Sequence, residues 1–131
     1  MIEPIWITKE ECLAFHNELL SWFGGLEGIR DEGMLDSALN RPRQLYHYEK
    51  PSYFQMAAAY ASGLVKNHPF LDGNKRSGLM AAALFLETNG YSFQAPEEEA
   101  VIMTRDLAAG EVEEAAYAAW LEKSSVERNS R

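Results

Sequence analysis

The sequence predicts an all-α protein, a bundle of about six helices around one buried central helix, with at most a token pair of strands. Apolar residues recur at helical spacing in successive segments, and glycine and proline residues separate these segments. With 131 residues, 47% of them hydrophobic, the chain can close one core. We therefore expect a single domain over 1–125, followed by a frayed tail over 126–131.

The first helix is expected over about residues 9–23. Thr8 followed by Glu11 is a capping-box signature, and apolar residues recur at helical spacing until a Gly-Gly pair ends the segment. Cys12, the only cysteine, takes an apolar position of this helix and has no partner for an internal disulfide. This position favours a buried thiol over a nucleophile.

A brief second helix is expected around Met34 to Leu39, because the amphipathic pattern stops at Pro42. The stretch from Arg43 to Pro51 contains aromatic rings but shows no helical periodicity. We expect an exposed loop or a short flap there.

Two apolar segments form the expected centre of the bundle. The third helix starts at the capping box of Ser52 and Gln55, carries many small residues, and ends near Asn67 because His68 precedes a proline. The fourth, over about residues 74–89, is apolar nearly all round. This pattern predicts that the fourth helix is the central buried one.

The C-terminal third of the chain predicts two further helices. An Asn-Gly pair ends the fourth helix, and residues 91–93 form a short extended link. A proline followed by three glutamates makes a favourable first turn at 96–99, and Gly110 closes that helix. The last helix is expected over about residues 112–124.

The charge and hydropathy of the chain exclude some classes of function. A formal net charge of -8 opposes attraction to a nucleic-acid backbone. No run approaches the roughly 20 apolar residues that span a bilayer, and the start lacks a secretory signal pattern. We expect a cytoplasmic protein that binds neither nucleic acid nor membrane. Lys66, His68, Lys75 and Arg76 nevertheless cluster closely in sequence, which indicates an anion site.

The segment from His68 to Arg76 reads HPFLDGNKR and links the third helix to the fourth. A histidine can accept a hydroxyl proton near neutral pH, and a carboxylate, here Asp72, can hold Mg²⁺. A glycine then lets the backbone approach closely, just before a helix N-terminus suited to phosphate. Taken singly, each residue has an ordinary structural explanation as a turn or a solvated helix start. Together they form the constellation needed for hydroxyl attack on a phosphate ester.

This segment resembles the motif of the Fic/Doc superfamily, whose general form is HPFxDGNGR, and in particular that of its death-on-curing branch. The Gly-Gly turn after the first helix, the segment DEGMLDSALNRP and the helix end LFLETNG lie where such proteins have similar sequences. The resemblance therefore spans most of the chain. It implies a Fic/Doc-type bundle and an enzyme that uses ATP and Mg²⁺.

The same resemblance implies three catalytic residues: His68 as the general base, Asp72 as the Mg²⁺ ligand that bridges the nucleotide phosphates, and Lys75 as a neutralising charge. Phe70 would be a core anchor. The nucleotide would be bound by a turn at Gly73 and Asn74, with Lys75 and Arg76 beside its phosphates.

Lys66 is a weaker candidate for the nucleotide site. It falls where death-on-curing toxins tend to have an arginine, so it is either a secondary phosphate contact or a solvent-facing helix end. The residues alone leave both interpretations open.

Two departures from the commoner Fic pattern bear on the reaction. Lys75 replaces the glycine before Arg76, and Leu79 replaces a further arginine. In AMP-transferring members these features help seat the α- and β-phosphates. The resemblance to death-on-curing toxins implies instead that the γ-phosphate of ATP is presented to a protein hydroxyl, a threonine of elongation factor Tu in that family, which stops translation.

The resemblance also implies a partner. Such toxins are usually inhibited by an antitoxin, and Ser124 and Glu127 lack the spacing of a self-inhibiting motif, so we expect a Phd-like antitoxin acting in trans. The flap residues Tyr46 to Lys50 either align the target chain as an added strand or form a plain loop. Two other functions stay open: an AMP transferase of the same fold, and a catalytically silent binding module.

Overall fold

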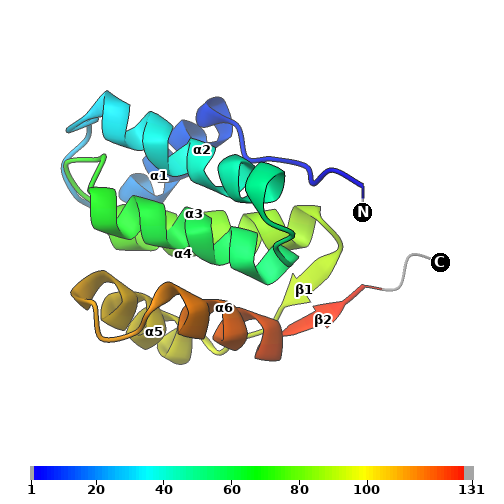
Figure 1. Ribbon diagram of the computed structural model, residues 1–131. Helices are drawn as coiled ribbons and strands as arrows, with labels where there is room; N and C mark the ends of the chain where they lie inside the picture. Colours follow the sequence, from blue (N-terminus) through cyan, green and yellow to red (C-terminus); the bar gives the residue numbers. More distant parts are fainter. Residues whose placement is uncertain (1, 129–131) are drawn as a thin grey trace.

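The computed structural model describes residues 2–128, which form a helical bundle with one small sheet (Figure 1). Within this range α3 and α4 lie between α1 and α2 on one side and α5 and α6 on the other. The predicted all-α class is therefore confirmed. The elements in chain order are α1 (Lys9–Phe23), α2 (Glu32–Tyr48), α3 (Tyr53–Asn67), α4 (Asn74–Thr88), β1 (Tyr91–Phe93), α5 (Glu97–Ala109), α6 (Glu114–Lys123) and β2 (Ser125–Glu127).

Helix α3 is the centre of the bundle, and this corrects the prediction that the fourth helix takes that place. Every residue from Met56 to Val65 is buried, whereas α4 keeps Leu79 and Leu84 partly exposed. Small residues decide the difference, since α2, α4, α5 and α6 can all approach the backbone of α3 closely. The apolar sequence of α4 gave no sign of its more peripheral place.

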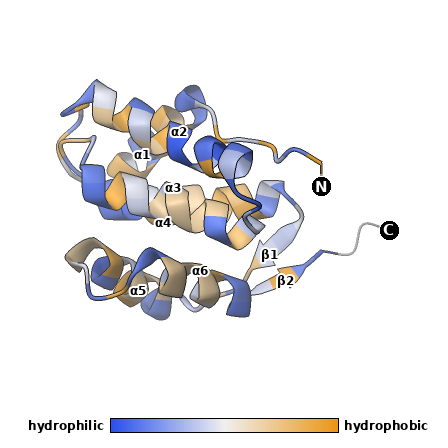
Figure 2. Ribbon diagram, in the orientation of Figure 1, coloured by the Kyte–Doolittle hydropathy of each residue, from blue (hydrophilic) through white to orange (hydrophobic). Residues whose placement is uncertain are grey.

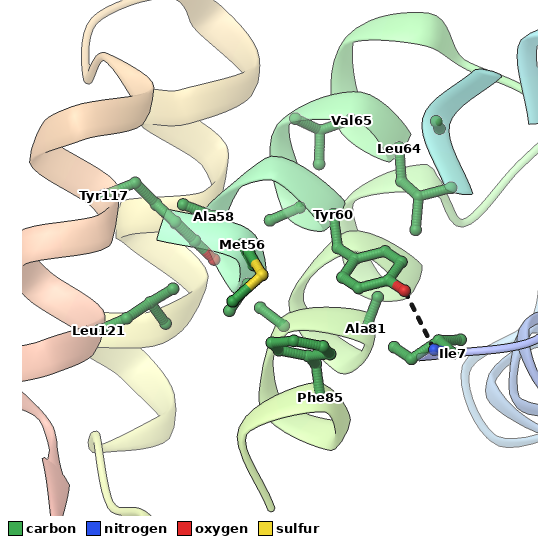
Figure 3. Close-up of a cluster of buried hydrophobic side chains, with 14 of the residues drawn as sticks. Ile7, Met56, Ala58, Tyr60, Leu64, Val65, Ala81, Phe85, Tyr117 and Leu121 are labelled. Carbon is green, nitrogen blue, oxygen red and sulfur yellow. Dashed lines mark hydrogen bonds between the residues drawn. The ribbon is translucent and has the colours of Figure 1, made fainter. Parts of the chain in front are cut away.

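Apolar side chains from four parts of the chain meet around α3 (Figure 3). Met56 lies between Phe85 of α4 and Tyr117 of α6. The hydroxyl of Tyr60 accepts a hydrogen bond from the backbone N–H of Ile7 at 3.0 Å, so the N-terminal segment is tied to the core. Figure 2 shows the apolar residues concentrated on α3 and α4, and none of the described helices is long and apolar enough to cross a membrane.

The predicted helix starts and stops are largely confirmed. Both capping boxes form: the side chains of Thr8 and Ser52 accept from the backbone N–H of the third helical residue, and Glu11 and Gln55 accept in return. Helix α3 ends at Asn67, as the following His-Pro pair predicted.

The predicted stop at Pro42 is wrong. Helix α2 continues through Pro42 to Tyr48, so most of the expected loop or flap between Arg43 and Pro51 is helical. An interior proline costs a helix about 3 kcal/mol. Here Pro42 is fully buried, and Tyr46 packs edge-on against Trp6 with ring centroids 5.7 Å apart, so tertiary packing outweighs that cost.

The C-terminal tail is ordered further than the sequence predicted. Strand β2 pairs antiparallel with β1, with Ser92 opposite Val126. Arg128 then donates to the carbonyls of Tyr91 and Glu87, at 3.0 and 2.5 Å. The expected fraying over 126–131 is thus wrong as far as residue 128, and the remainder of that prediction, 129–131, lies outside the described residues.

The prediction of a buried thiol is confirmed. Cys12 is fully buried and unpaired. Burial raises the pKa of this thiol to about 12, so the nucleophilic thiolate is strongly disfavoured.

Candidate active site

The motif loop, defined here as residues 68–73, begins with a constrained residue. His68 ends α3 in the left-handed conformation, with φ 50° and ψ 55°, and is the one non-glycine residue of the described chain with a positive φ. For a residue with a Cβ this conformation costs about 1–2 kcal/mol. It persists only where the surrounding contacts determine it.

The α1–α2 loop, residues 24–31, supplies many of those contacts. The backbone N–H of Leu71 donates to the carbonyl of Gly28 at 3.1 Å, and Ile29 and Phe70 form an isolated β-bridge. The N–H groups of Arg30 and Asp31 both donate to the carbonyl of Pro69. Figure 1 shows the two loops at the same end of the bundle. The segment beside the motif is therefore 24–31, whereas the stretch 46–50 proposed for target alignment belongs largely to α2.

Asp72 is held by three hydrogen bonds. Its two carboxylate oxygens accept from the backbone N–H groups of Gly73 and Leu26, at 3.1 and 3.2 Å. Its carbonyl lies 2.8 Å from Nε2 of His16, which must donate because a carbonyl oxygen only accepts. His16 is buried and stacks on Phe70 with ring centroids 3.6 Å apart. The carboxylate is thus oriented but keeps lone pairs free for a ligand.

Helix α4 starts without a side-chain cap. Its N-cap, Gly73, has φ 79°, a conformation that favours glycine. The side-chain amide of Asn74 instead hydrogen-bonds to the backbone of Phe70: its oxygen accepts from the N–H and its nitrogen donates to the carbonyl, both at 3.0 Å. What this helix start offers an anion is therefore its backbone N–H groups rather than the Asn74 side chain.

All the predicted site residues except Lys66 line one cavity of about 460 Å³. Lys66, in the last turn of α3, is not among its lining residues. Helix α5 forms a wall that the sequence did not predict. The lining residues are His68, Leu71, Asp72, Gly73, Asn74, Lys75, Arg76 and Leu79 from the motif loop and α4, and Val101, Thr104 and Arg105 from α5.

Arg76 and Arg105 give this cavity a positive character in an acidic chain. The Arg76 guanidinium lies over the ring of Phe23, the last residue of α1, at 4.3 Å from its centroid, a cation–π contact that orients it. Arg105 comes from α5, and among residues 2–128 its neighbour Asp106 is the one acidic residue within ion-pair distance, at 3.4 Å. Both guanidiniums are suited to bidentate contacts with phosphate.

The carboxylates of residues 2–128 do not form a closed metal site. Within the described residues no three His, Cys, Asp or Glu side chains gather in a way that could hold a metal ion. Mg²⁺ bound to a nucleotide typically takes one or two protein carboxylates, and phosphate oxygens and water complete its shell. The single oriented carboxylate of Asp72 fits that requirement.

The family model described as the Fic/DOC family matches residues 6–86, from the N-terminal segment into α4, and includes the whole motif loop. The chain belongs to the Fic/DOC family. Helix α5, with Arg105, lies beyond the part of the chain that the Fic/DOC model matches.

Two curated relatives place it in the death-on-curing branch of the Fic/DOC family. The chain is 35% identical over 108 residues to Protein kinase doc of Escherichia phage P1, which covers 81% of this chain and 84% of that protein. It is 41% identical over 75 residues to Toxin Doc of Mycolicibacterium smegmatis, covering 56% of this chain and 58% of that protein.

Proposed function

We propose that this Fic/DOC protein is a toxin that transfers the γ-phosphate of ATP to a hydroxyl group of a protein, with elongation factor Tu as the target. The products would be a phosphoprotein and ADP. The observation that carries the proposal is that a histidine, an oriented carboxylate and an uncapped helix N-terminus line one cavity. The relative named Protein kinase doc supports the same reaction class.

His68 would act as the general base. An imidazole can take a proton from a hydroxyl near neutral pH, provided that the attacking oxygen lies within hydrogen-bond reach. The left-handed turn at His68 sets the residue at the junction of α3 and the motif loop, where it lines the cavity. As the target hydroxyl attacks phosphorus, its proton passes to His68 and the bond to the ADP oxygen breaks.

The start of α4 would hold the phosphates. Its free backbone N–H groups and the positive end of its dipole favour an anion. Lys75 and Arg76 add positive charge from the same turn, and Arg105 adds it from α5. Because phosphoryl transfer is catalysed mainly by positioning and charge neutralisation, these groups carry much of the proposed rate enhancement.

Asp72 would hold the Mg²⁺ that accompanies the nucleotide. The ion supplies neutralisation of the charge that develops on the phosphate oxygens. The N–H groups of Gly73 and Leu26 keep the carboxylate aimed, since each of its oxygens accepts one of them.

Lys75 and Leu79 favour γ-phosphoryl transfer over AMP transfer. Both line the cavity at the positions where AMP-transferring relatives have a glycine and an arginine. A lysine side chain narrows the space beside the helix start, and a leucine offers no donor to a second phosphate. AMP transfer is the alternative function that the test below separates.

A toxin of this kind needs an inhibitor in its own cell. The relative named Toxin Doc supports this part of the proposal. We expect a Phd-like antitoxin that binds in trans.

The test is to incubate the purified chain with Mg-ATP and elongation factor Tu and to measure the intact mass of the target. A gain of one phosphate that His68→Ala abolishes supports the proposal. A gain of AMP would replace it with the alternative. No gain on elongation factor Tu or on any protein of a cell lysate would leave the kinase assignment without support and overturn it.

A further inference from the structure

Arg30 makes a two-point contact with the end of α3. Its Nε donates to the carbonyl of His68 at 2.6 Å, and its Nη2 donates to the carbonyl of Asn67 at 2.8 Å. Arg30 belongs to the α1–α2 loop, 38 residues before His68 in sequence. One guanidinium therefore binds two successive carbonyls, the second of which belongs to the candidate base.

The end of α3 lacks the backbone hydrogen bond that closes each of the other described helices. In each of the other five helices of residues 2–128, a backbone N–H at the C-cap donates back into the last turn. In α3 the C-cap is His68 and no such bond forms. The next residue is Pro69, which has no N–H, so the usual left-handed capping bond cannot form either. The Arg30 guanidinium instead supplies hydrogen bonds at this helix end to the carbonyls of Asn67 and His68, and its charge suits the negative end of the helix.

The hydrogen bonds from Arg30 help to fix the backbone conformation of His68. The backbone of His68 is in the left-handed conformation, which needs support from surrounding contacts. This conformation sets the orientation of both its carbonyl and its side chain. The backbone N–H of Arg30 also donates to the carbonyl of Pro69 at 2.6 Å, and the amide of Asn67 donates to the carbonyl of Met34 at 3.1 Å. His68 is thus held between clamped neighbours.

We propose that Arg30 is a positioning residue for His68, which keeps the imidazole aimed into the cavity by binding the carbonyls of Asn67 and His68. The role rests on the proposed function, since it needs His68 to be the base. The planar guanidinium fork suits this task, whereas the point charge of a lysine would favour one carbonyl at a time.

The chain offers a matched control in Arg128. This residue follows β2 and also donates to two backbone carbonyls, those of Glu87 at the end of α4 and of Tyr91 in β1, away from the motif loop; it also pairs with the Glu87 carboxylate at 2.9 Å. Both Arg30→Gln and Arg128→Gln remove a guanidinium that binds two carbonyls at a helix end, and Arg128→Gln removes an ion pair as well, but Arg30 alone binds the carbonyl of His68.

The experiment measures kcat, the Kd of Mg-ATP, the melting temperature and the imidazole NMR signals of His68, which are assigned by their absence in His68→Ala. For Arg30→Gln we expect a fall in kcat of about 10², the loss typical of a misplacement of about 1 Å, with an unchanged Kd and shifted His68 signals. Arg30→Lys should lose less than Arg30→Gln. Arg128→Gln should keep both kcat and the His68 signals.

Several outcomes would overturn the positioning role. One is a rise in the Kd of Mg-ATP as large as the fall in kcat, which would make Arg30 a ligand contact. Others are unshifted His68 signals in Arg30→Gln, or an equal loss of kcat in Arg128→Gln. If Arg30→Gln does not fold, Arg30→Lys decides on the same readouts. If the wild-type chain transfers nothing, the proposed function fails, while the His68 signals still decide the role of Arg30.

Discussion

Replacing Gly78 by alanine tests the packing that holds the two sides of the site together. Helix α3 ends just before His68 and α4 begins at the anion-binding turn, so the spacing of these helices sets the distance from the candidate base to the phosphate. A Cβ at Gly78 would lie 2.7 Å from Cγ1 of Val65 and 3.1 Å from the carbonyl oxygen of Ala61. Carbon contacts are ordinarily about 3.5–4.0 Å, so the helices must separate.

The magnitude follows from two opposing effects. Overpacking a core costs about 1–3 kcal/mol, and the upper end applies because Val65 is stiff at χ1 and the Ala61 oxygen belongs to the backbone. Replacing glycine by alanine inside a helix returns about 1 kcal/mol. We expect a net loss of about 2 kcal/mol in the free energy of unfolding, or about 6–10 °C in melting temperature.

The assay is thermal and urea unfolding followed by circular dichroism, with Gly33→Ala as the matched control. Gly33 is also helical, but its added Cβ would meet only Oδ1 of Asp31, at 3.4 Å. The control should be neutral or slightly stabilising. A Gly78→Ala variant as stable as the wild type, or a control that is equally destabilised, would refute the account of this helix contact.

Three further predictions concern the motif loop, the α5 wall and the core. Asn74→Ala leaves the buried N–H of Phe70 without an acceptor and should lower the free energy of unfolding by about 1–3 kcal/mol, measured by urea unfolding. An unchanged urea midpoint would contradict the stabilising role of the Asn74 amide. Arg105→Gln should raise the KM for ATP about tenfold with no change in melting temperature, since a charge-assisted hydrogen bond is worth about 1.5–3 kcal/mol; an unchanged KM would remove Arg105 from the site. Burial raises the pKa of Tyr60 and of Tyr117 from 10.0 to about 12, so the folded state favours the neutral phenols and the free energy of unfolding should fall as pH rises from about 10 to 12. A Tyr117→Phe variant should lose less free energy of unfolding over that window, and an equal loss in variant and wild type would contradict the role of the Tyr117 phenol.

The sequence was informative wherever a feature depends on neighbours in the chain. Capping boxes at Thr8 and Ser52 and the stop before Pro69 are local effects, and each appears in the structure as predicted. The motif residues lie within one short segment, so their convergence on one cavity was also predictable from their order. Local rules failed at Pro42, where contacts with Trp6 and the core outweigh the proline penalty.

Parts of the site that come from distant segments were beyond prediction from one sequence. Arg30 reaches His68 from the α1–α2 loop, and Arg105 reaches the cavity from α5. Neither position differs in local pattern from a solvated arginine. Similarly, the periodicity of α4 could not show that α3, with its smaller side chains, takes the central place.

The central claim is that the γ-phosphate moves to the target and that His68 enables the transfer. The most direct measurement uses ATP labelled on the γ-phosphate and, in parallel, ATP labelled on the α-phosphate, each incubated with the chain, Mg²⁺ and elongation factor Tu. We predict that only the γ-label becomes bound to protein, and that His68→Ala abolishes this labelling. Protein-bound α-label, or γ-labelling that survives in His68→Ala, would contradict the claim.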